Sequence, residues 1–337
     1  MCYNLFRVDD YMNENDDVLE KVKAGILGFI TGDAFGVPVE FTIRSERKRE
    51  LLKEMIGNGS HPVPEGTWSD DTSMTLATFD SIRECGNINY QDMMDKYCEW
   101  VFNKKYTATD LVFDVGSTTG YAIDNYHKNN MSPTECGGKE DNHNGNGSLM
   151  RMLPIVYYLH YIELDNDIKM DIIKNYSSLT HGHEVSILGC AIYNDYMNNL
   201  LKGYGKEDAY LELDIDKYRE YFSEESIERY RRILKHELDE AEEDSIKSTG
   251  YVVDTLEACI WTILHTNSYE EAIVEAVSLG DDTDTVAAIT GSMAATIYGE
   301  ESIPERWLSK VRRVDYVINI VTGYCDVLND NNRKGSF

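Results

Sequence analysis

The spacing of apolar residues constrains the fold of this chain more than any other feature. Apolar side chains recur every three or four positions over long stretches, as in "YQDMMDKYCEWVFNKKY" (90–106) and "YVVDTLEACIWTILH" (251–265). That period places them on one face of an α-helix, whereas a half-buried strand would alternate every second residue. Only six prolines interrupt 337 residues, and proline is strongly disruptive inside helices. The sequence therefore predicts an all-α fold, a compact single-domain helical bundle.

One predicted helix carries a row of glycines. In "KVKAGILGFITGDAFGVPVEF" (21–41), Gly28, Gly32 and Gly36 stand four residues apart, so they share one helix face. Each glycine costs a helix interior about 1 kcal/mol relative to alanine. Because this cost needs an offsetting contact, we expect another backbone or a ligand to approach that face closely.

The chain has no low-complexity linker and no short-period repeat, which favours one domain. We expect an N-terminal extension over residues 1–20, a helical domain over 21–326 and a flexible tail over 327–337. Residues 205–247 are rich in charge and contain opposite charges four residues apart, such as Glu228 and Arg232. This segment is typical of a solvated helical pair inserted on the outside of a bundle.

Composition narrows the classes of partner and compartment. Sixty acidic and 32 basic residues give a net charge of −28, which argues against general binding to nucleic acids or anionic membranes. No stretch approaches the ~18 to 20 apolar residues of a membrane span, and the acidic N-terminus lacks a signal-peptide pattern. The seven cysteines form no C-x-x-C pair, so neither a disulfide framework nor a zinc knuckle is indicated. We expect a cytoplasmic protein that acts as a monomer.

Two distant acidic clusters each precede an apolar helical pattern: "GTWSDDTSMTLATFDSI" (66–82) and "GDDTDTVAAITGSMAATIYG" (280–299). Carboxylate and hydroxyl oxygens suit hard cations such as Mg²⁺ or Mn²⁺. Either cluster alone could be a helix N-cap with solvated neighbours, but their repetition favours a metal site. Magnesium-dependent prenyl diphosphate enzymes also use two acidic motifs. Here the last Asp of each D-D-x-x-D pattern is replaced, by Met74 and Thr285.

A third motif, "NHNGNGSLMRMLPI" (142–155), is typical of an anion cradle. It is a glycine- and asparagine-rich turn that we expect to run into a helix, with Ser148 as the N-cap and Arg151 in the first turn. Free backbone N–H groups at such a helix start bind phosphates. The alternative is an ordinary serine-capped turn.

Together these motifs resemble one family, the ADP-ribosylglycohydrolases, and in particular the bacterial branch that includes the dinitrogenase reductase-activating glycohydrolase. The motifs that carry the resemblance, in order, are "GDAFGVPVEF", "WSDDTSM", "DVGSTTGYAI", "GNGSLMR", "LTHGH", "GYVVDTLEACIW" and "LGDDTDTVAAITGSMAATIYG". The resemblance covers about residues 22–299, and residues 205–247 match nothing in it.

The resemblance implies an all-α fold with a binuclear Mg²⁺ or Mn²⁺ centre at the floor of a cleft that binds ADP-ribose. One metal would be held by Ser69, Asp70 and Asp71, and the other by Asp282, Asp284 and Thr285, with Asp284 bridging. Glu40 matches a family glutamate that either reaches a metal or acts as a movable gate. Asp114 matches a carboxylate that assists catalysis, with a helix N-cap near Gly116 as the alternative.

The same resemblance implies a set of substrate contacts. Backbone amides of Gly145, Asn146, Gly147 and Ser148 would receive the pyrophosphate, and Arg151 would add positive charge to the cleft. His181 or His183, together with Tyr251, would contact the terminal ribose or the adenosine half, although an isolated histidine is more often a core residue.

The implied function is a metal-dependent hydrolase that releases ADP-ribose from a modified protein or small molecule. The N-glycosidic arginine linkage is the first expectation. Serine-linked or other O-linked ADP-ribose remains open, and a non-catalytic ADP-ribose binding protein is the alternative from another class. Intact carboxylates in both clusters favour the enzyme.

Overall fold

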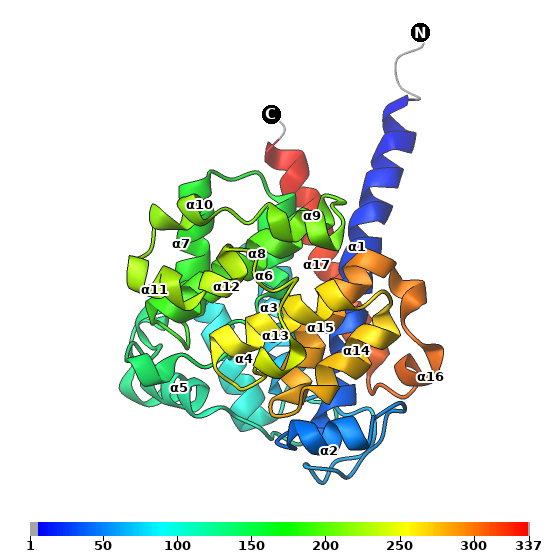
Figure 1. Cartoon of the computed structure of the whole chain (residues 1–337). Coiled ribbons are helices and arrows are strands. Elements are labelled where there is room, and N and C mark those ends of the chain that lie inside the picture. The colour runs from blue at the N-terminus through cyan, green and yellow to red at the C-terminus, as the bar shows by residue number, and fades with distance from the viewer. Residues whose placement is uncertain (1–5, 336–337) are drawn as a thin grey trace.

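Helices form all the regular structure in residues 6–335, the part of the chain that this computed structural model describes (Figure 1). The α-helices are α1 Phe6–Gly36, α2 Arg44–Arg49, α3 Asp70–Cys85, α4 Tyr90–Asn103, α5 Ser117–Asn129, α6 Leu153–Tyr161, α7 Asn166–Ser177, α8 Glu184–Leu201, α9 Lys206–Leu211, α10 Ile215–Arg219, α11 Glu224–Arg229, α12 Arg231–Leu234, α13 Val252–His265, α14 Tyr269–Ser278, α15 Thr283–Tyr298, α16 Glu305–Leu308 and α17 Val314–Gly335. Five short 3-10 helices, η1 Val37–Val39, η2 Pro133–Glu135, η3 Asp141–His143, η4 Glu243–Ser245 and η5 Glu300–Ser302, lie between them. The all-α prediction is confirmed.

Helices α1 and α15 form the centre of the bundle. They pack along each other, α15 also contacts α13 and α14, and α3 packs against α4 and α17 (Figure 1). The buried apolar side chains form one continuous cluster that includes Trp68, Trp100 and Trp307. A single shared core confirms the prediction of one compact domain.

The glycine row explains the close packing of α1 on α15. Cβ atoms added at Gly28, Gly32 and Gly36 would lie 2.1–2.4 Å from carbonyl oxygens, those of Gly291, Ala287 and Thr283 respectively. The expected approach of another backbone is thus confirmed. Because the two helices touch backbone to backbone, the segment that follows α1 is brought next to the N-terminus of α15.

Both ends of the chain differ in detail from the sequence-based boundaries. Helix α1 is continuous from Phe6 to Gly36 and α17 continues to Gly335, so the predicted boundaries at residues 20 and 326 fall inside helices. The first turns of α1 extend beyond the body of the bundle (Figure 1). The predictions for residues 1–5, 336 and 337 lie outside the described residues.

One segment, Asp17–Val39, is long and apolar enough to cross a membrane, which the sequence reading did not expect. Within the bundle, 94% of its most apolar window is buried. The core helix of a soluble protein has the same length and composition, so this segment is weak evidence for a membrane span.

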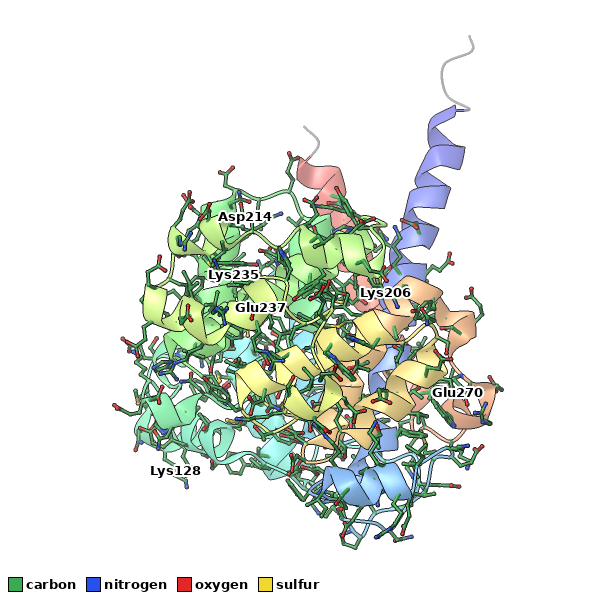
Figure 2. All side chains as sticks on the ribbon, in the orientation of Figure 1. Lys128, Lys206, Asp214, Lys235, Glu237 and Glu270 are labelled. Atoms are coloured by element: carbon green, nitrogen blue, oxygen red, sulfur yellow. The ribbon has the colours of Figure 1, made fainter. Side chains whose placement is uncertain are left out.

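Residues 205–247 form a layer of short helices, α9 to α12 and η4, so the predicted helical pair is wrong. Tyr210, Tyr218 and Tyr230 of this layer are buried, so the segment packs against the bundle rather than lying free in solvent. The expected Glu228–Arg232 pair is absent from the described contacts, because Arg232 instead bonds Glu257 at 2.9 Å. Charged side chains cover the outer surface, among them Asp214, Lys235 and Glu237 (Figure 2).

Candidate metal and catalytic site

A buried aspartate of α1 fixes the start of α3. Asp33 is fully buried, and its carboxylate accepts hydrogen bonds from the backbone N–H groups of Ser69 (2.9 Å) and Thr72 (3.1 Å) and from the Thr72 hydroxyl. These N–H groups lack partners within their own helix, and a carboxylate at this end also suits the helix dipole. Asp33 thereby holds the first acidic cluster in place on the central helix.

The two acidic clusters, about 210 residues apart in sequence, meet in the structure. Asp71 Oδ2 accepts hydrogen bonds from the hydroxyls of Ser69 (3.0 Å) and Thr285 (3.3 Å), one from each cluster. Oxygen atoms of Glu40, Asp282 and Asp284 lie within 4.8 Å of one another. Asp70 belongs to the same group, because Glu40 and Asp282 act electrostatically on its carboxyl. All six residues predicted to hold metals therefore lie at this junction.

The junction holds more negative charge than its own hydrogen bonds satisfy. Burial, reinforced by the neighbouring carboxylates, raises the pKa values of Asp70, Asp71 and Asp284 well above their usual range. Two of the buried oxygens, Asp71 Oδ1 and Asp284 Oδ2, have no hydrogen-bond partner among the described residues. Buried carboxylates need a compensating partner, and an all-oxygen donor set fits a hard divalent cation. The residues present therefore fit a Mg²⁺ or Mn²⁺ site.

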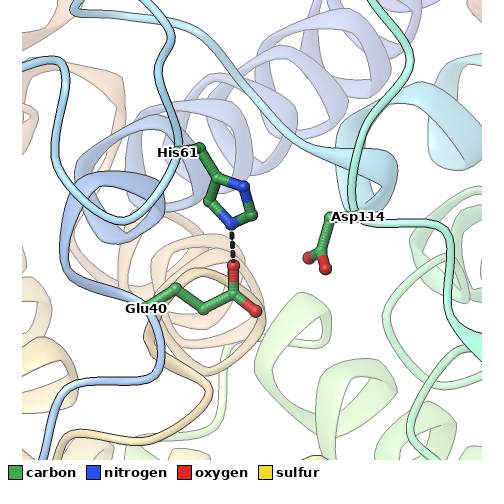
Figure 3. A group of neighbouring side chains, drawn as sticks. All are labelled: Glu40, His61 and Asp114. Carbon is green, nitrogen blue, oxygen red and sulfur yellow. Dashed lines mark hydrogen bonds and ion pairs between the residues drawn. The ribbon is translucent and has the colours of Figure 1, made fainter.

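Glu40, His61 and Asp114 form a second group beside this junction (Figure 3). Glu40 ends η1 and is 3% exposed, and its Oε2 lies 2.5 Å from His61 Nε2. Burial and the charges of Asp114 and Asp282 raise the pKa of Glu40 to about 10. One ligand atom each from Glu40, His61 and Asp114 falls within 4.8 Å.

Asp114 does not cap a helix, so the alternative reading of this residue is wrong. Helix α5 begins at Ser117 with Gly116 as its N-cap. Asp114 instead adopts a positive φ of 55° and directs its carboxylate toward Glu40 and His61 (Figure 3). Burial raises its pKa, although His61 opposes this shift.

Two further residues at this end of α1 and α15 have positive φ. Phe41 (φ 61°) and Asp281 (φ 56°) are linked because the Phe41 N–H donates to the Asp281 carbonyl at 2.7 Å and the Asp281 N–H donates to the Thr42 carbonyl at 2.8 Å. Non-glycine residues in this conformation persist only where the surroundings enforce it, and they cluster at functional sites.

The glycine-rich loop 145–148 borders the junction, but it does not start a helix. Helix α6 begins at Leu153 with Met152 as its N-cap, so the prediction that Ser148 caps a helix is wrong. The reason is Pro154, which fits the first turn of a helix because it lacks an N–H group. The Asn146 side chain donates a hydrogen bond to Asp282 Oδ2 at 2.7 Å. The Asn146 backbone N–H donates to the Gly250 carbonyl at 3.0 Å.

Arg151 lies beneath this loop, outside any helix, so its predicted place in a first helical turn is wrong. It is fully buried, and its guanidinium donates to the carbonyls of Gly147 and Tyr176 and to the hydroxyls of Tyr97 and Thr180. The N–H groups of the guanidinium are therefore already bonded to acceptors within the protein. Arg151 therefore supports the loop from inside the protein, and its charge does not face a ligand.

Two of the predicted ribose and adenosine contacts, His181 and Tyr251, lie beside the same loop. His181 is 2% exposed and packs against Gly147, where an added Cβ would lie 2.7 Å from its ring. Burial and the nearby Arg151 charge lower the pKa of His181 to about 3, so its ring is neutral. His183 caps α8 by accepting from the Val185 N–H at 3.2 Å. Tyr251 pairs with Gly145 through an isolated bridge.

Sequence reasoning missed Asp33 and His61. Asp33 had a signal, because an acidic residue beside Gly32 on an apolar helix calls for a buried partner. His61 stands in a proline- and glycine-rich loop, "GNGSHPVPEG", and nothing in that pattern links it to Glu40. Only the fold brings them together.

Comparisons with known proteins agree with this geometry. The family model described as ADP-ribosylglycohydrolase matches residues 14–334. The ADP-ribosylarginine hydrolase Tri1 of Serratia proteamaculans (strain 568) is 31% identical over 309 residues, which cover 90% of this chain and 78% of that protein. The ADP-ribosyl-[dinitrogen reductase] glycohydrolase of Rhodospirillum rubrum is 26% identical over 297 residues, covering 87% of this chain and 91% of the relative.

A solved structure, "ADP-ribosylglycohydrolase-related protein complex", aligns with a TM-score of 0.76 and 26% identity, covering 93% of this chain and 99% of that one. The model match over nearly the whole chain and the shared fold lead to one conclusion: this chain belongs to the ADP-ribosylglycohydrolase family.

Proposed function

We propose that this protein is a metal-dependent hydrolase that releases ADP-ribose from modified arginine side chains. The observation that carries the proposal is the meeting of the two acidic clusters, with unpartnered buried oxygens on Asp71 and Asp284, beside Glu40 and Asp114. The relative from Serratia proteamaculans, named as an ADP-ribosylarginine hydrolase, supports the arginine linkage.

Six residues would hold two Mg²⁺ or Mn²⁺ ions: Ser69, Asp70 and Asp71 from the start of α3, and Asp282, Asp284 and Thr285 from the start of α15. When bound, such cations supply Lewis acidity that orients the ribose hydroxyls and acidifies a water molecule. The chain contributes the orientation of these ligands. Asp33 fixes the α3 cluster through Ser69 and Thr72, and Asn146 fixes Asp282.

Glu40 and Asp114 would manage the protons of the reaction. Cleavage of the bond between C1″ of the ribose and the guanidine nitrogen passes through an oxocarbenium-like state. A proton must leave the attacking water and a proton must reach the departing nitrogen. Glu40 and Asp114 lie beside the ligand cluster and close to each other, so both transfers have a carboxyl group within reach.

Because the Asn146 N–H is bonded to the Gly250 carbonyl, the backbone N–H groups of Gly145, Gly147 and Ser148 would face the pyrophosphate. His181 and Tyr251 would lie at the borders of this loop. The pairing of Gly145 with Tyr251 and the packing of Gly147 on His181 support this assignment. A neutral His181 donates or accepts a hydrogen bond without adding charge. The role of Arg151 in this scheme is to hold the loop through the Gly147 carbonyl.

We also propose that the protein acts in the cytoplasm as a monomer. The six described cysteines that have no disulfide partner support a reducing compartment. Size-exclusion chromatography with light scattering would test the oligomeric state.

Release of free ADP-ribose from ADP-ribosyl-arginine and ADP-ribosyl-serine peptides tests the function directly. The assay is run with Mg²⁺, with Mn²⁺ and with EDTA, alongside calorimetry of ADP-ribose binding. We expect metal-dependent release from the arginine peptide. Release from the serine peptide alone would reassign the linkage, and tight binding without release from either would indicate a non-catalytic binding protein.

A pair of aspartate variants sharpens this test. Asp114→Asn removes a carboxylate that faces Glu40, whereas Asp124→Asn removes an exposed carboxylate that pairs with Lys128 on α5. We expect the first to lose at least about 100-fold in kcat, the lower range for a general acid or base, and the second to keep wild-type activity. Equal activities would remove Asp114 from the mechanism.

A further inference from the structure

His61 stands out because the proposed mechanism gives it no role although it directly contacts Glu40. It lies in the loop between α2 and α3, and its side chain is 15% exposed, whereas the Glu40 side chain is 4% exposed. We propose that His61 is a positioning residue that holds the Glu40 carboxylate against the acidic junction. This inference rests on the proposed function, because it concerns the same site.

The backbone around His61 is fixed to the turn that carries Glu40. The Ser60 N–H donates to the Pro38 carbonyl at 2.8 Å, and the Ser60 hydroxyl donates to the carbonyl of Glu40 itself. Gly59 fits against Pro38 so closely that an added Cβ would lie 1.7 Å from the Pro38 oxygen. Main-chain movement of His61 away from Glu40 would therefore break several contacts at once.

Aromatic rings restrict the imidazole of His61. The centroid of the Phe113 ring lies 4.9 Å away and that of the Phe41 ring lies 6.0 Å away. The ring thus has little freedom to rotate, and its Nε2 stays 2.5 Å from Glu40 Oε2. The other carboxylate oxygen of Glu40 points away from the ring (Figure 3).

Glu40 needs a positioning partner because other carboxyl groups crowd it. Oxygen atoms of Asp282 and Asp284 lie within 4.8 Å of a Glu40 oxygen, and each of these groups disfavours ionisation of the others. Left alone, an ionised Glu40 side chain would turn outward. A hydrogen-bond partner on the far side removes that freedom, and partners of this kind are known to orient groups that surround metals.

Three variants test the inference on the full chain. His61→Ala removes the partner, and His61→Gln keeps a nitrogen donor near the position of Nε2. His160→Ala is the matched control, since His160 on α6 is also partly buried and makes a hydrogen bond of 2.8 Å with Asn198 on α8. If the alanine variant does not fold, His61→Asn replaces it, because its shorter side chain cannot reach Glu40.

The readouts are kcat and KM on an ADP-ribosyl-arginine peptide, and the Kd for Mn²⁺ from electron paramagnetic resonance. We expect His61→Ala to lower kcat by about 10- to 100-fold with little change in KM, and His61→Gln to recover most of the loss. His160→Ala should match the wild type. A kcat that is unchanged in His61→Ala, or equally low in His61→Ala and His61→Gln, would overturn the inference.

The Mn²⁺ titration separates this inference from the proposed function. If the wild type releases no ADP-ribose from either peptide, the proposed function fails. The Kd for Mn²⁺ then tests the role of His61 independently of activity. A roughly tenfold weaker Kd in His61→Ala that His61→Gln restores would support positioning. Wild-type affinity in both variants would refute it.

Discussion

Substitution of Gly32 by alanine tests whether the contact between α1 and α15 sets the geometry of the site. The new Cβ would lie 2.1 Å from the Ala287 carbonyl oxygen and 2.6 Å from its carbon, where real Cβ contacts essentially never fall below 3.0 Å. Restoring that limit requires the two helices to separate by about 0.9 Å. No flexible side chain can move aside, because the clash is with backbone.

The expected loss of stability follows from two opposing terms. Overpacking costs about 1–3 kcal/mol, and a backbone clash belongs at the upper end. Alanine recovers about 1 kcal/mol of helix propensity relative to glycine. The net loss is about 2 kcal/mol. With an unfolding entropy near 2.1 cal/mol/K per residue, about 0.7 kcal/mol/K for this chain, the Tm should fall by about 3 °C.

The matched control is Gly120→Ala on α5. There an added Cβ would meet only Val115 Cγ1 at 3.8 Å, an ordinary contact. Such a substitution stabilises a protein by about 0.4–1 kcal/mol, so the Tm should rise by about 1 °C. Differential scanning calorimetry of the wild type and both variants measures the two shifts, which have opposite signs.

Activity should fall together with stability in Gly32→Ala. Helix α1 carries Asp33 and leads to Glu40, whereas α15 begins beside Asp282. A misplacement near 1 Å can cost about 100-fold in rate, so we expect a loss of that order in kcat at a temperature where the variant is folded. A variant that melts at or above the wild-type Tm with full activity would refute this account of the helix contact.

Three further predictions concern the charges of the site. Asp284→Asn should lower kcat by about 10³-fold, because metal ligands support several kcal/mol of transition-state stabilisation. In EDTA this variant should melt no lower than the wild type, because one crowded carboxyl group has been removed. A lower Tm would contradict that reasoning. Mg²⁺ or Mn²⁺ at 100 times Kd should stabilise the wild type by about 2.7 kcal/mol, about 4 °C in Tm, and an unchanged melting curve in both metals would exclude the assigned centre. The pKa of His181 in the folded protein, about 3, lies below the usual 6.5. As the pH falls, the unfolded state therefore binds the proton first. The stability that His181 contributes above pH 6.5 is lost as the pH falls toward 3. The loss is about 2 kcal/mol at pH 5, and calorimetry of the wild type against His181→Gln at pH 7 and pH 5 checks whether the difference shrinks.

Local patterns predicted the fold class and the ligand-bearing segments well. The three- to four-residue period over 90–106 and 251–265 became α4 and α13, because that period reflects burial of one helix face. The acidic clusters were visible because the same combination of carboxylates and hydroxyls precedes an apolar helical pattern twice. The glycine row predicted a close backbone contact, but it did not identify α15 as the partner.

Errors arose where packing overrides local preference. Ser148 has the residue type of an N-cap, but Pro154 sets the helix start downstream. Arg151 has the charge of a phosphate ligand, but it is enclosed by Tyr97 and Tyr176. Residues 205–247 read as solvated helices, yet Tyr210, Tyr218 and Tyr230 of this segment are buried. Exposure is a property of the assembled protein, so residue type alone does not reveal it.

The sequence by itself determined that the chain is helical, that it carries two oxygen-rich clusters, and that Asp284 and Asp71 are candidate ligands, because these features depend on neighbours a few residues away. The tertiary structure alone decided that Thr285 reaches Asp71, that Asp33 secures α3, and that His61 contacts Glu40. These contacts join segments 21 to 214 residues apart. Their partners are selected by the packing of helices and loops that are not neighbours in sequence, which no local pattern specifies.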